Sequence, residues 1–175
     1  GFNHILPKGM DHILFVLGLF FLSARLRPLL WQVSAFTVAH TITLALGALG
    51  WVQVSPDIVE PLIAASIVYV AVENIFLRRL TVWRPLVIFG FGLLHGLGFA
   101  SVLGNIGLPR DQFVAALIGF NIGVELGQLT VIAIAFATVS VWFRAHPKYR
   151  GRVAIPASIT IAAIGAYWFV ERVFL

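Results

Sequence analysis

Imidazole and carboxylate side chains occur inside the most apolar segments of this 175-residue chain. The histidines are His12 in GMDHILF, His40 in FTVAHTITL and His95 in FGLLHGLGFA, and the acids are Glu73 in VAVENIF and Glu125 in NIGVELGQL. In lipid such a group costs at least about 2.5–3.5 kcal/mol, so it normally faces the interior of a helical bundle and has a partner there. Imidazole and carboxylate ligands together suit Ni, Co, Zn, Cu or Fe. The pattern therefore predicts a polar, metal-binding site inside a membrane protein.

The composition supports a membrane protein. Hydrophobic residues make up 60% of the chain and charged residues only 11%, whereas a soluble domain carries about 25% charged residues. There is no cysteine, which excludes disulfides and thiolate metal ligands. The net charge of +5 does not indicate nucleic-acid binding, because the basic residues fall in short loops between apolar segments rather than on one patch.

Six apolar segments approach the length of about 20 residues that crosses a bilayer. We predict spans at residues 9–24, 29–51, 56–77, 84–103, 112–143 and 153–174, the first open to extension upstream towards His4, in a single all-α transmembrane domain covering residues 1–175. Proline lacks an N–H and is best tolerated in the first turn of a helix, which suits Pro28, Pro56 and Pro85. The expected fold is a polytopic bundle of about six helices.

The loop charges predict an orientation. Nine basic residues lie at the ends of the spans that face one side: Arg25, Arg27, Arg78, Arg79, Arg84, Arg144, Lys148, Arg150 and Arg152. The other side carries only Lys8, Arg110 and Arg172. Cytoplasmic loops are enriched in lysine and arginine, so we expect the first side to be cytoplasmic and both termini to be outside.

The polar groups of different spans are predicted to meet at one depth. An α-helix rises 1.5 Å per residue, and counting from the outer ends places His40, His95 and Asn121 at one level. Glu125 comes just beneath them and His12 just above. We therefore expect His40 and His95 to approach one another across the second and fourth spans.

Glycines in two spans would allow the close helix packing that such a site needs. The fourth span holds Gly90, Gly92, Gly96 and Gly98, and the fifth holds Gly119, Gly123 and Gly127 at four-residue spacing. The remaining acids also have structural interpretations. Glu73 would pair with Arg78 or Arg79 about one turn further along, and Glu60 would lie among the lipid headgroups without a role.

The chain also resembles a known family. The segments GFNHILPKGMDHILF, AFTVAHTITL, VENIF, FGFGLLHGLGFA and FNIGVELGQL, which lie between about residue 1 and residue 130, are together similar to the HupE/UreJ proteins. Those are bacterial membrane proteins regarded as nickel or cobalt permeases. Carried onto this chain, the resemblance implies metal-handling roles for His4, Asp11, His12, His40, His95 and Glu125. It also implies the bacterial inner membrane and, as in the longer members, an exported region before Gly1.

These observations lead to one functional hypothesis. The protein binds a divalent transition metal (Ni, Co or Zn) within the membrane and passes it inward. Asp11 and His12 would capture the ion from outside, and His40 and His95 would form the central site. Glu125 would supply charge and Asn121 a neutral oxygen. The expected partners are the lipid bilayer and the metal ion, with other membrane subunits or a second copy of the chain left open, and no nucleic acid.

Two other hypotheses fit the same residues. Three histidines and a carboxylate can hold a zinc ion that activates water, as in an intramembrane hydrolase. Alternatively, the polar cluster joins helices in a structural subunit of a larger membrane complex. A polar path to both faces favours transport. A closed site with one water and a lateral opening to lipid favours hydrolysis, and fully paired side chains without metal favour the structural role.

Overall fold

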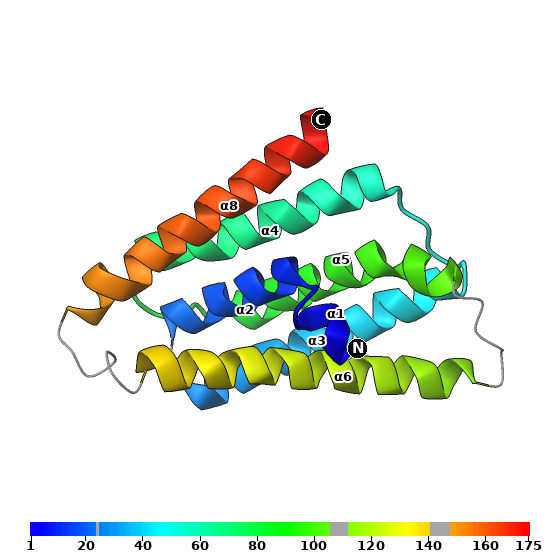
Figure 1. Ribbon diagram of the computed structural model, residues 1–175, viewed down its shortest axis with the longest axis horizontal. Helices are drawn as coiled ribbons and strands as arrows, with labels where there is room; N and C mark the ends of the chain where they lie inside the picture. Colours follow the sequence, from blue (N-terminus) through cyan, green and yellow to red (C-terminus); the bar gives the residue numbers. More distant parts are fainter. Residues whose placement is uncertain (24, 106–111, 141–147) are drawn as a thin grey trace.

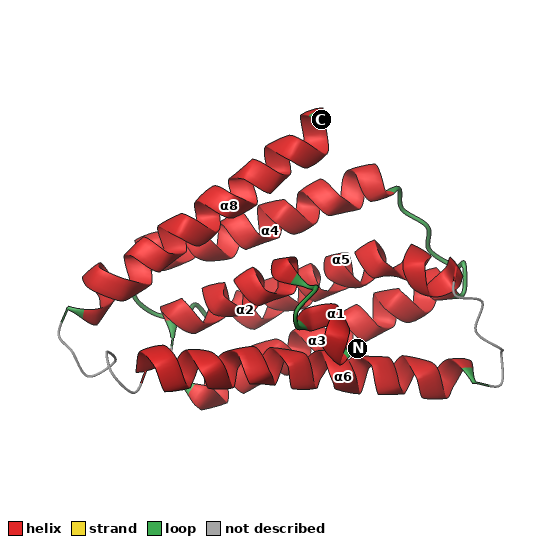
Figure 2. Ribbon diagram, in the orientation of Figure 1, coloured by secondary structure: helices red, strands yellow, loops and turns green. Residues whose placement is uncertain are grey.

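The computed structural model describes residues 1–23, 25–105, 112–140 and 148–175, and every regular element within them is helical. In chain order these elements are α1 (Phe2–Ile5), α2 (Met10–Leu22), α3 (Leu26–Ala48), α4 (Pro56–Phe76), α5 (Arg84–Asn105), α6 (Phe113–Ala135), the π-helical segments η1 (Phe136–Ser140) and η2 (Arg150–Ala154), and α8 (Ile155–Phe174). Figure 2 shows them gathered in one bundle. The prediction of an all-α fold is confirmed.

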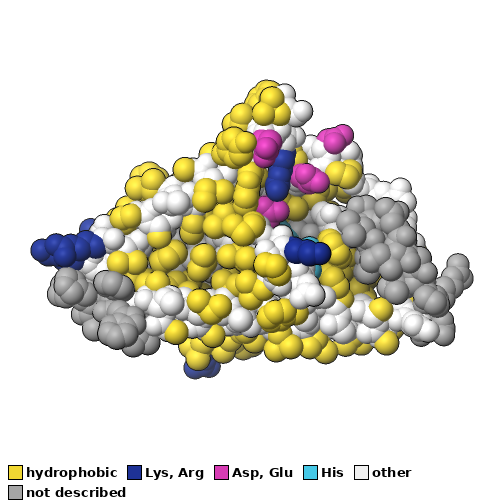
Figure 3. Space-filling model, viewed as in Figure 1, with side chains coloured by type: hydrophobic (Ala, Val, Ile, Leu, Met, Phe, Trp, Pro, Cys, Tyr) yellow, Lys and Arg dark blue, Asp and Glu magenta, His cyan; other side chains and the backbone are white. Residues whose placement is uncertain are grey.

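The surface of the bundle is that of a membrane protein. Four helical stretches are long and apolar enough to cross a membrane, by length and composition: Leu26–Ala48, Pro56–Phe76, Phe113–Val139 and Arg150–Phe174. Large apolar side chains such as Ile118, Ile122 and Leu126 are more than half exposed, and hydrophobic side chains cover much of the face in Figure 3. Water-soluble monomers rarely expose such continuous apolar area. The molecule is a polytopic helical membrane protein.

The first predicted span differs from the structure. Helix α2 has 13 residues and therefore rises only about 20 Å, which is less than the roughly 30 Å of a hydrocarbon core. The chain does not continue upstream as one helix, because Leu6 precedes a proline and takes an extended conformation, as residues before proline tend to do. Instead the separate helix α1 lies beside α6, about halfway along the bundle (Figure 1).

The other predicted spans coincide with helices, with shifted ends. The fourth starts at Arg84 as expected, and the sixth begins as a π-helical segment at Arg150. The last residues of the fifth prediction, 141–143, lie outside the described residues. In space, α3 packs along α5 and α4 along α8 (Figure 1). This pairing brings chain segments about 50 and 100 residues apart side by side.

Two glycines of α5 allow the close approach of α3. A Cβ atom at Gly92 would overlap the carbonyl oxygen of Phe36, and one at Gly96 would overlap the carbonyl oxygen of His40. Without side chains at these positions the two backbones pack directly against each other, as small residues permit in lipid. The glycines therefore determine how deeply α3 carries His40 into the bundle.

Two glycines of α6 form the surface against which α1 packs. An added Cβ atom at Gly123 would lie 2.6 Å from the backbone nitrogen of Phe2, and one at Gly127 would lie 2.7 Å from the Cβ atom of Ile5. By contrast, a Cβ atom at Gly119 would meet nothing within 4 Å. Helix α1 thus packs against two of the three glycines that recur at four-residue spacing in α6.

We expect Gly127→Ala to destabilise the protein and Gly119→Ala not to. The first change forces α1 away from α6, and overpacking of this kind costs about 1–3 kcal/mol. The second enters open space and replaces glycine by the best helix former, which favours the helix by up to about 1 kcal/mol. Thermal unfolding of the two purified variants in the same detergent measures the difference. Equal unfolding temperatures would contradict the close packing of α1 against Gly127.

Candidate metal site

Three histidines from three different elements converge at the centre of the bundle. One ring nitrogen each from His4 in α1, His12 in α2 and His40 in α3 lies within 4.8 Å of the other two. Nitrogens that share a zinc ion at about 2.0–2.1 Å are at most about 4.2 Å apart. Three nitrogens at that distance from one tetrahedral zinc ion lie about 3.4 Å apart, so side-chain rotations that move them by about 1 Å would bring all three onto one ion.

One nitrogen of each of these three rings has no hydrogen-bond partner among the described residues. The Nε2 atoms of His4, His12 and His40 are buried, and none makes a hydrogen bond to a described residue. His12 and His40 are 6% and 0% exposed. Leaving a buried polar atom without a partner costs about 1–3 kcal/mol, so three at one point is an arrangement that a ligand would explain.

A hydrogen bond fixes the tautomer of His40. Its Nδ1 lies 3.2 Å from Oδ1 of Asn121, and the amide nitrogen of Asn121 donates to the carbonyl oxygen of Leu117. Because an amide oxygen only accepts, Nδ1 must carry the proton and donate it. The lone pair is then on Nε2, the atom that is buried without a partner among the described residues. Histidine ligands to metals are oriented by partners of this kind, so Asn121 holds His40 in the tautomer that a metal ligand requires, and its predicted role as an oxygen ligand stays a prediction.

His95 is oriented in the same way by Ser66, a residue that the sequence pattern did not single out. The hydroxyl of Ser66 donates to the carbonyl oxygen of Ile63 at 2.7 Å, so it accepts from Nε2 of His95 at 3.0 Å. The lone pair of His95 is therefore on Nδ1, which is buried without a partner among the described residues. The ring of His95 lies 5.0 Å from that of His12.

His12 is the histidine in contact with the three others of the bundle interior. Its ring centroid lies 4.9 Å from that of His4, 5.8 Å from that of His40 and 5.0 Å from that of His95. We expected His40 and His95 to form the central pair, whereas the structure groups His40 with His4 and His12, and His95 joins this group through its contact with His12. The helix of His12 begins only at Met10, which leaves room for α1 to bring His4 into the cluster.

Glu125 lies in a different polar group from the histidines. Its carboxylate accepts hydrogen bonds from Ser34, at 2.8 Å, and from Thr37 of α3. Thr37 also contacts Gln128 one turn further along α6. The predicted role of Glu125 as the charge of the metal site therefore has no support in these contacts. The carboxylate instead joins α6 to the polar face of α3.

A small cavity of about 210 Å³ leads from the surface to the histidines. His4, His12 and His95 line its inner part, and Lys8, Asp11, Glu60 and Arg172 line it as well. Charged side chains of both signs surround a visible histidine on the face shown in Figure 3. This cavity offers a hydrated ion a route to the cluster.

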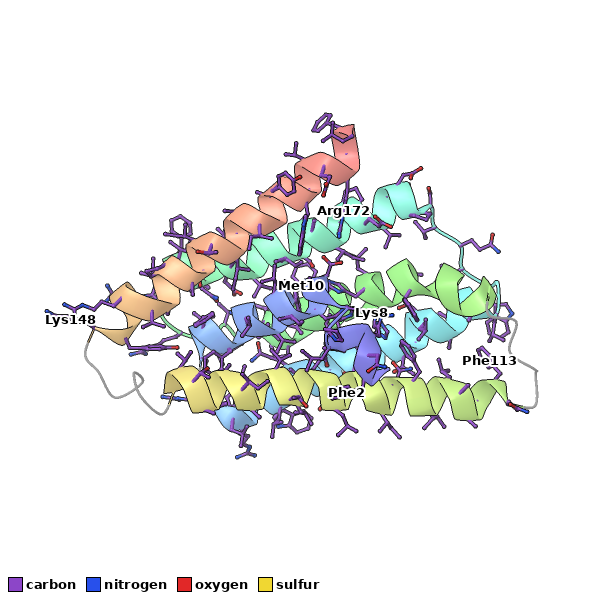
Figure 4. The ribbon with its side chains drawn as sticks, in the orientation of Figure 1. Phe2, Lys8, Met10, Phe113, Lys148 and Arg172 are labelled. Carbon is purple, nitrogen blue, oxygen red and sulfur yellow. The ribbon has the colours of Figure 1, made fainter. Side chains whose placement is uncertain are left out.

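Arg172 of α8 contacts both acids that line this cavity, Asp11 and Glu60. One Nη atom lies 3.2 Å from both carboxylate oxygens of Asp11, and Nε lies 4.0 Å from the carboxylate of Glu60. Figure 4 shows Arg172 reaching from α8 towards Met10 and Lys8. Glu60 therefore has a charged neighbour, and its predicted position among the lipid headgroups stays a prediction. Asp11 is also not a free ligand, because a guanidinium occupies its carboxylate.

Another ion pair, which is more deeply buried, lies between α4 and α5. Arg84 is 2.7 Å from the carboxylate of Glu73, and the two side chains are 1% and 9% exposed. Nε of Arg84 also donates to Gln32 of α3 at 2.9 Å. The predicted pairing of Glu73 with Arg78 or Arg79 is wrong, because α4 ends at Phe76 and the turn that follows directs those two side chains to the surface.

Fold and site together define a class of protein: a polytopic membrane protein with a cluster of histidines in the interior of its bundle. A family model described as HupE / UreJ protein matches residues 1–172. The chain therefore belongs to the HupE/UreJ family, which confirms the resemblance, and membership implies a membrane function related to nickel or cobalt transport. No curated protein and no solved structure matches the chain.

Proposed function

We propose that this protein is a permease of the bacterial inner membrane for a divalent transition-metal ion, with nickel and cobalt as the foremost substrates. The supporting observations are that one ring nitrogen each of His4, His12 and His40 lies within 4.8 Å of the other two, and that the Nε2 atoms of these rings are buried without a partner among the described residues. Imidazole nitrogen suits nickel, zinc and copper, whereas magnesium and calcium prefer oxygen. Zinc would fit the same ligands.

The substrate would reach the histidines through the cavity at Arg172. A divalent cation competes with the guanidinium for the carboxylates of Asp11 and Glu60, so its arrival would release Arg172 and loosen the contact between α8 and α2. The ion would then pass to His4 and His12, which line the same cavity. His95 also lines it, with Nδ1 free to serve as a further ligand.

The other end of the route would be closed by the Glu73–Arg84 pair. This pair joins α4 to α5 and, through Gln32, to α3. Access from one side at a time is the requirement for a carrier, and membrane ion pairs mark such pathways. We infer a state of the protein in which the cavity at Arg172 is open to the outer side and the basic-loop side is closed.

Uptake into proteoliposomes tests the proposal. Wild-type protein should carry Ni²⁺ or Co²⁺ to an entrapped fluorescent metal indicator, and Mg²⁺ should remain outside. The Thr130→Ala variant is a matched control, because this residue is bonded only within its own helix at an exposed position. Uptake of Mg²⁺ at the same rate, or no uptake above that of empty vesicles, would reject a transition-metal permease. Metal binding without uptake would favour the hydrolase or the structural subunit.

Metal binding should weaken as the pH falls. A histidine must be neutral to donate its lone pair, so protons and metal compete for the same nitrogens. Equilibrium dialysis of Ni²⁺ at a series of pH values between about 8 and 5, which spans the ordinary histidine pKa, measures the effect. Affinity that rises as the pH falls would indicate that protons do not compete with the metal and that the histidines are not the ligands.

A further inference from the structure

The basic end of the bundle contains a large cavity that the metal route does not use. Its volume is about 680 Å³. The cavity lies where the link between α2 and α3 meets the link between α4 and α5. Arg25, Arg78 and Arg79 line it together with Ser23.

The charge of this cavity is entirely positive among its described lining residues. No carboxylate lines it there, and Arg25, Arg78 and Arg79 form no ion pair with another described residue. The acid nearest in sequence, Glu73, is already paired with Arg84. Three guanidiniums around one hollow repel each other, and an anion between them would relieve that repulsion. Guanidinium groups match the oxygens of a phosphate through paired hydrogen bonds.

An apolar groove of about 250 Å³ continues from the basic cavity. The two share Pro28 and Leu80 as lining residues, and the groove extends along Trp31 and Pro85. The side chain of Trp31 is 69% exposed and forms one wall of the groove. Free phosphate would need only the basic cavity. A charged hollow joined to an apolar groove at a membrane surface instead matches an amphiphile with an anionic head and an acyl chain.

We propose that this combined site binds an anionic phospholipid of the leaflet that faces the basic loops. Arg25, Arg78 and Arg79 hold the phosphodiester, and one acyl chain lies in the groove beside Trp31. Basic pockets between transmembrane helices on the cytoplasmic side bind lipid headgroups in this manner. Gln32 and Arg84 also line the groove, so the bound chain lies beside the Glu73–Arg84 pair.

Lipid titration monitored by native mass spectrometry tests the proposal on the purified full chain. Wild-type protein should bind phosphatidylglycerol in preference to phosphatidylcholine. The Arg78→Gln/Arg79→Gln variant should bind phosphatidylglycerol about 30-fold more weakly, on the scale of the contribution of two basic residues near an anionic membrane. The matched control is Arg27→Gln/Arg152→Gln, which removes two charges from the same end of the molecule but none from the cavity.

Further measurements distinguish a lipid site from a phosphate site and from diffuse charge attraction. Trp31→Ala should weaken phosphatidylglycerol binding, and inorganic phosphate should not displace the lipid. Thermal unfolding in phosphatidylcholine micelles checks that each variant is folded. Equal weakening in both arginine pairs would show that diffuse charge attracts the lipid and would overturn the site. Displacement by inorganic phosphate, or equal binding of the two lipids, would also overturn it.

Discussion

His12→Ala should lower the affinity for Ni²⁺ by more than about 100-fold while leaving the protein folded. Loss of a residue that merely orients a ligand costs about 10–100-fold in metal affinity, and loss of a ligand should exceed this. The Nε2 atom of His12 is buried without a partner, so removing it takes away an unsatisfied group rather than a structural bond. Isothermal titration with Ni²⁺ and thermal unfolding without metal measure the two effects.

Asn74→Ala is a control that should lower the stability of the protein without lowering its Ni²⁺ affinity. Its amide donates to the carbonyl oxygen of Gly18 at 2.8 Å and to the hydroxyl of Ser158 at 3.1 Å, and so joins α4 to α2 and α8. We expect this variant to lose stability by about 1–3 kcal/mol and to retain Ni²⁺ affinity. If His12→Ala instead loses stability as Asn74→Ala does, while the wild type binds no metal, the histidines join helices and the permease proposal fails.

Glu73→Gln should be the most destabilising single substitution at the basic end of the bundle. It leaves the guanidinium of Arg84, 1% exposed, without a counter-charge, and breaking a buried ion pair from one side costs about 3–5 kcal/mol. The double variant Glu73→Gln/Arg84→Gln removes both charges and should recover much of that loss. Chemical or thermal unfolding of the two variants in one detergent gives the comparison.

Removing the Glu73–Arg84 pair also tests whether this pair closes the basic-loop side of the transport route. The double variant, which lacks both charges, should fold. It should also let Ni²⁺ pass more readily, because the contact between α4 and α5 is weakened at the end opposite the cavity at Arg172. Proteoliposomes that contain the double variant should therefore show faster Ni²⁺ entry than wild type. If the double variant is as unstable as Glu73→Gln, Arg84 has a further buried role. Unchanged transport would remove the pair from the closure mechanism.

The sequence allowed the helices and the approach of His12 to His40 to be predicted, for identifiable reasons. A bilayer requires each span to be about 20 apolar residues, so hydropathy alone located α3, α4, α6 and α8. The constant rise of a helix placed His12 and His40 near one level, and the structure brings them together. The position of His4 came from the family resemblance alone.

The charged pairs could not be predicted, because they depend on the turns between helices. Glu73 has Arg78 and Arg79 nearer in sequence, yet the turn after α4 brings Arg84 to it. Asp11 pairs with Arg172, 161 residues away, because α8 leans across the end of α2. Two signals were present in the sequence: Pro7 indicated that α1 would be separate, and Ser66 on the inner face of α4 was available to orient His95.

X-ray absorption spectroscopy of the nickel-loaded protein tests the histidine metal site most directly, because it reports the atoms around the metal itself. We predict about one Ni²⁺ per chain, a first shell of nitrogen and oxygen, and the outer-shell scattering of at least three imidazole rings. In the His4→Ala/His12→Ala/His40→Ala variant that scattering should fall to that of at most one ring, His95. A wild-type protein without bound nickel, or nickel surrounded by oxygen alone, would contradict a histidine metal site at the centre of this bundle.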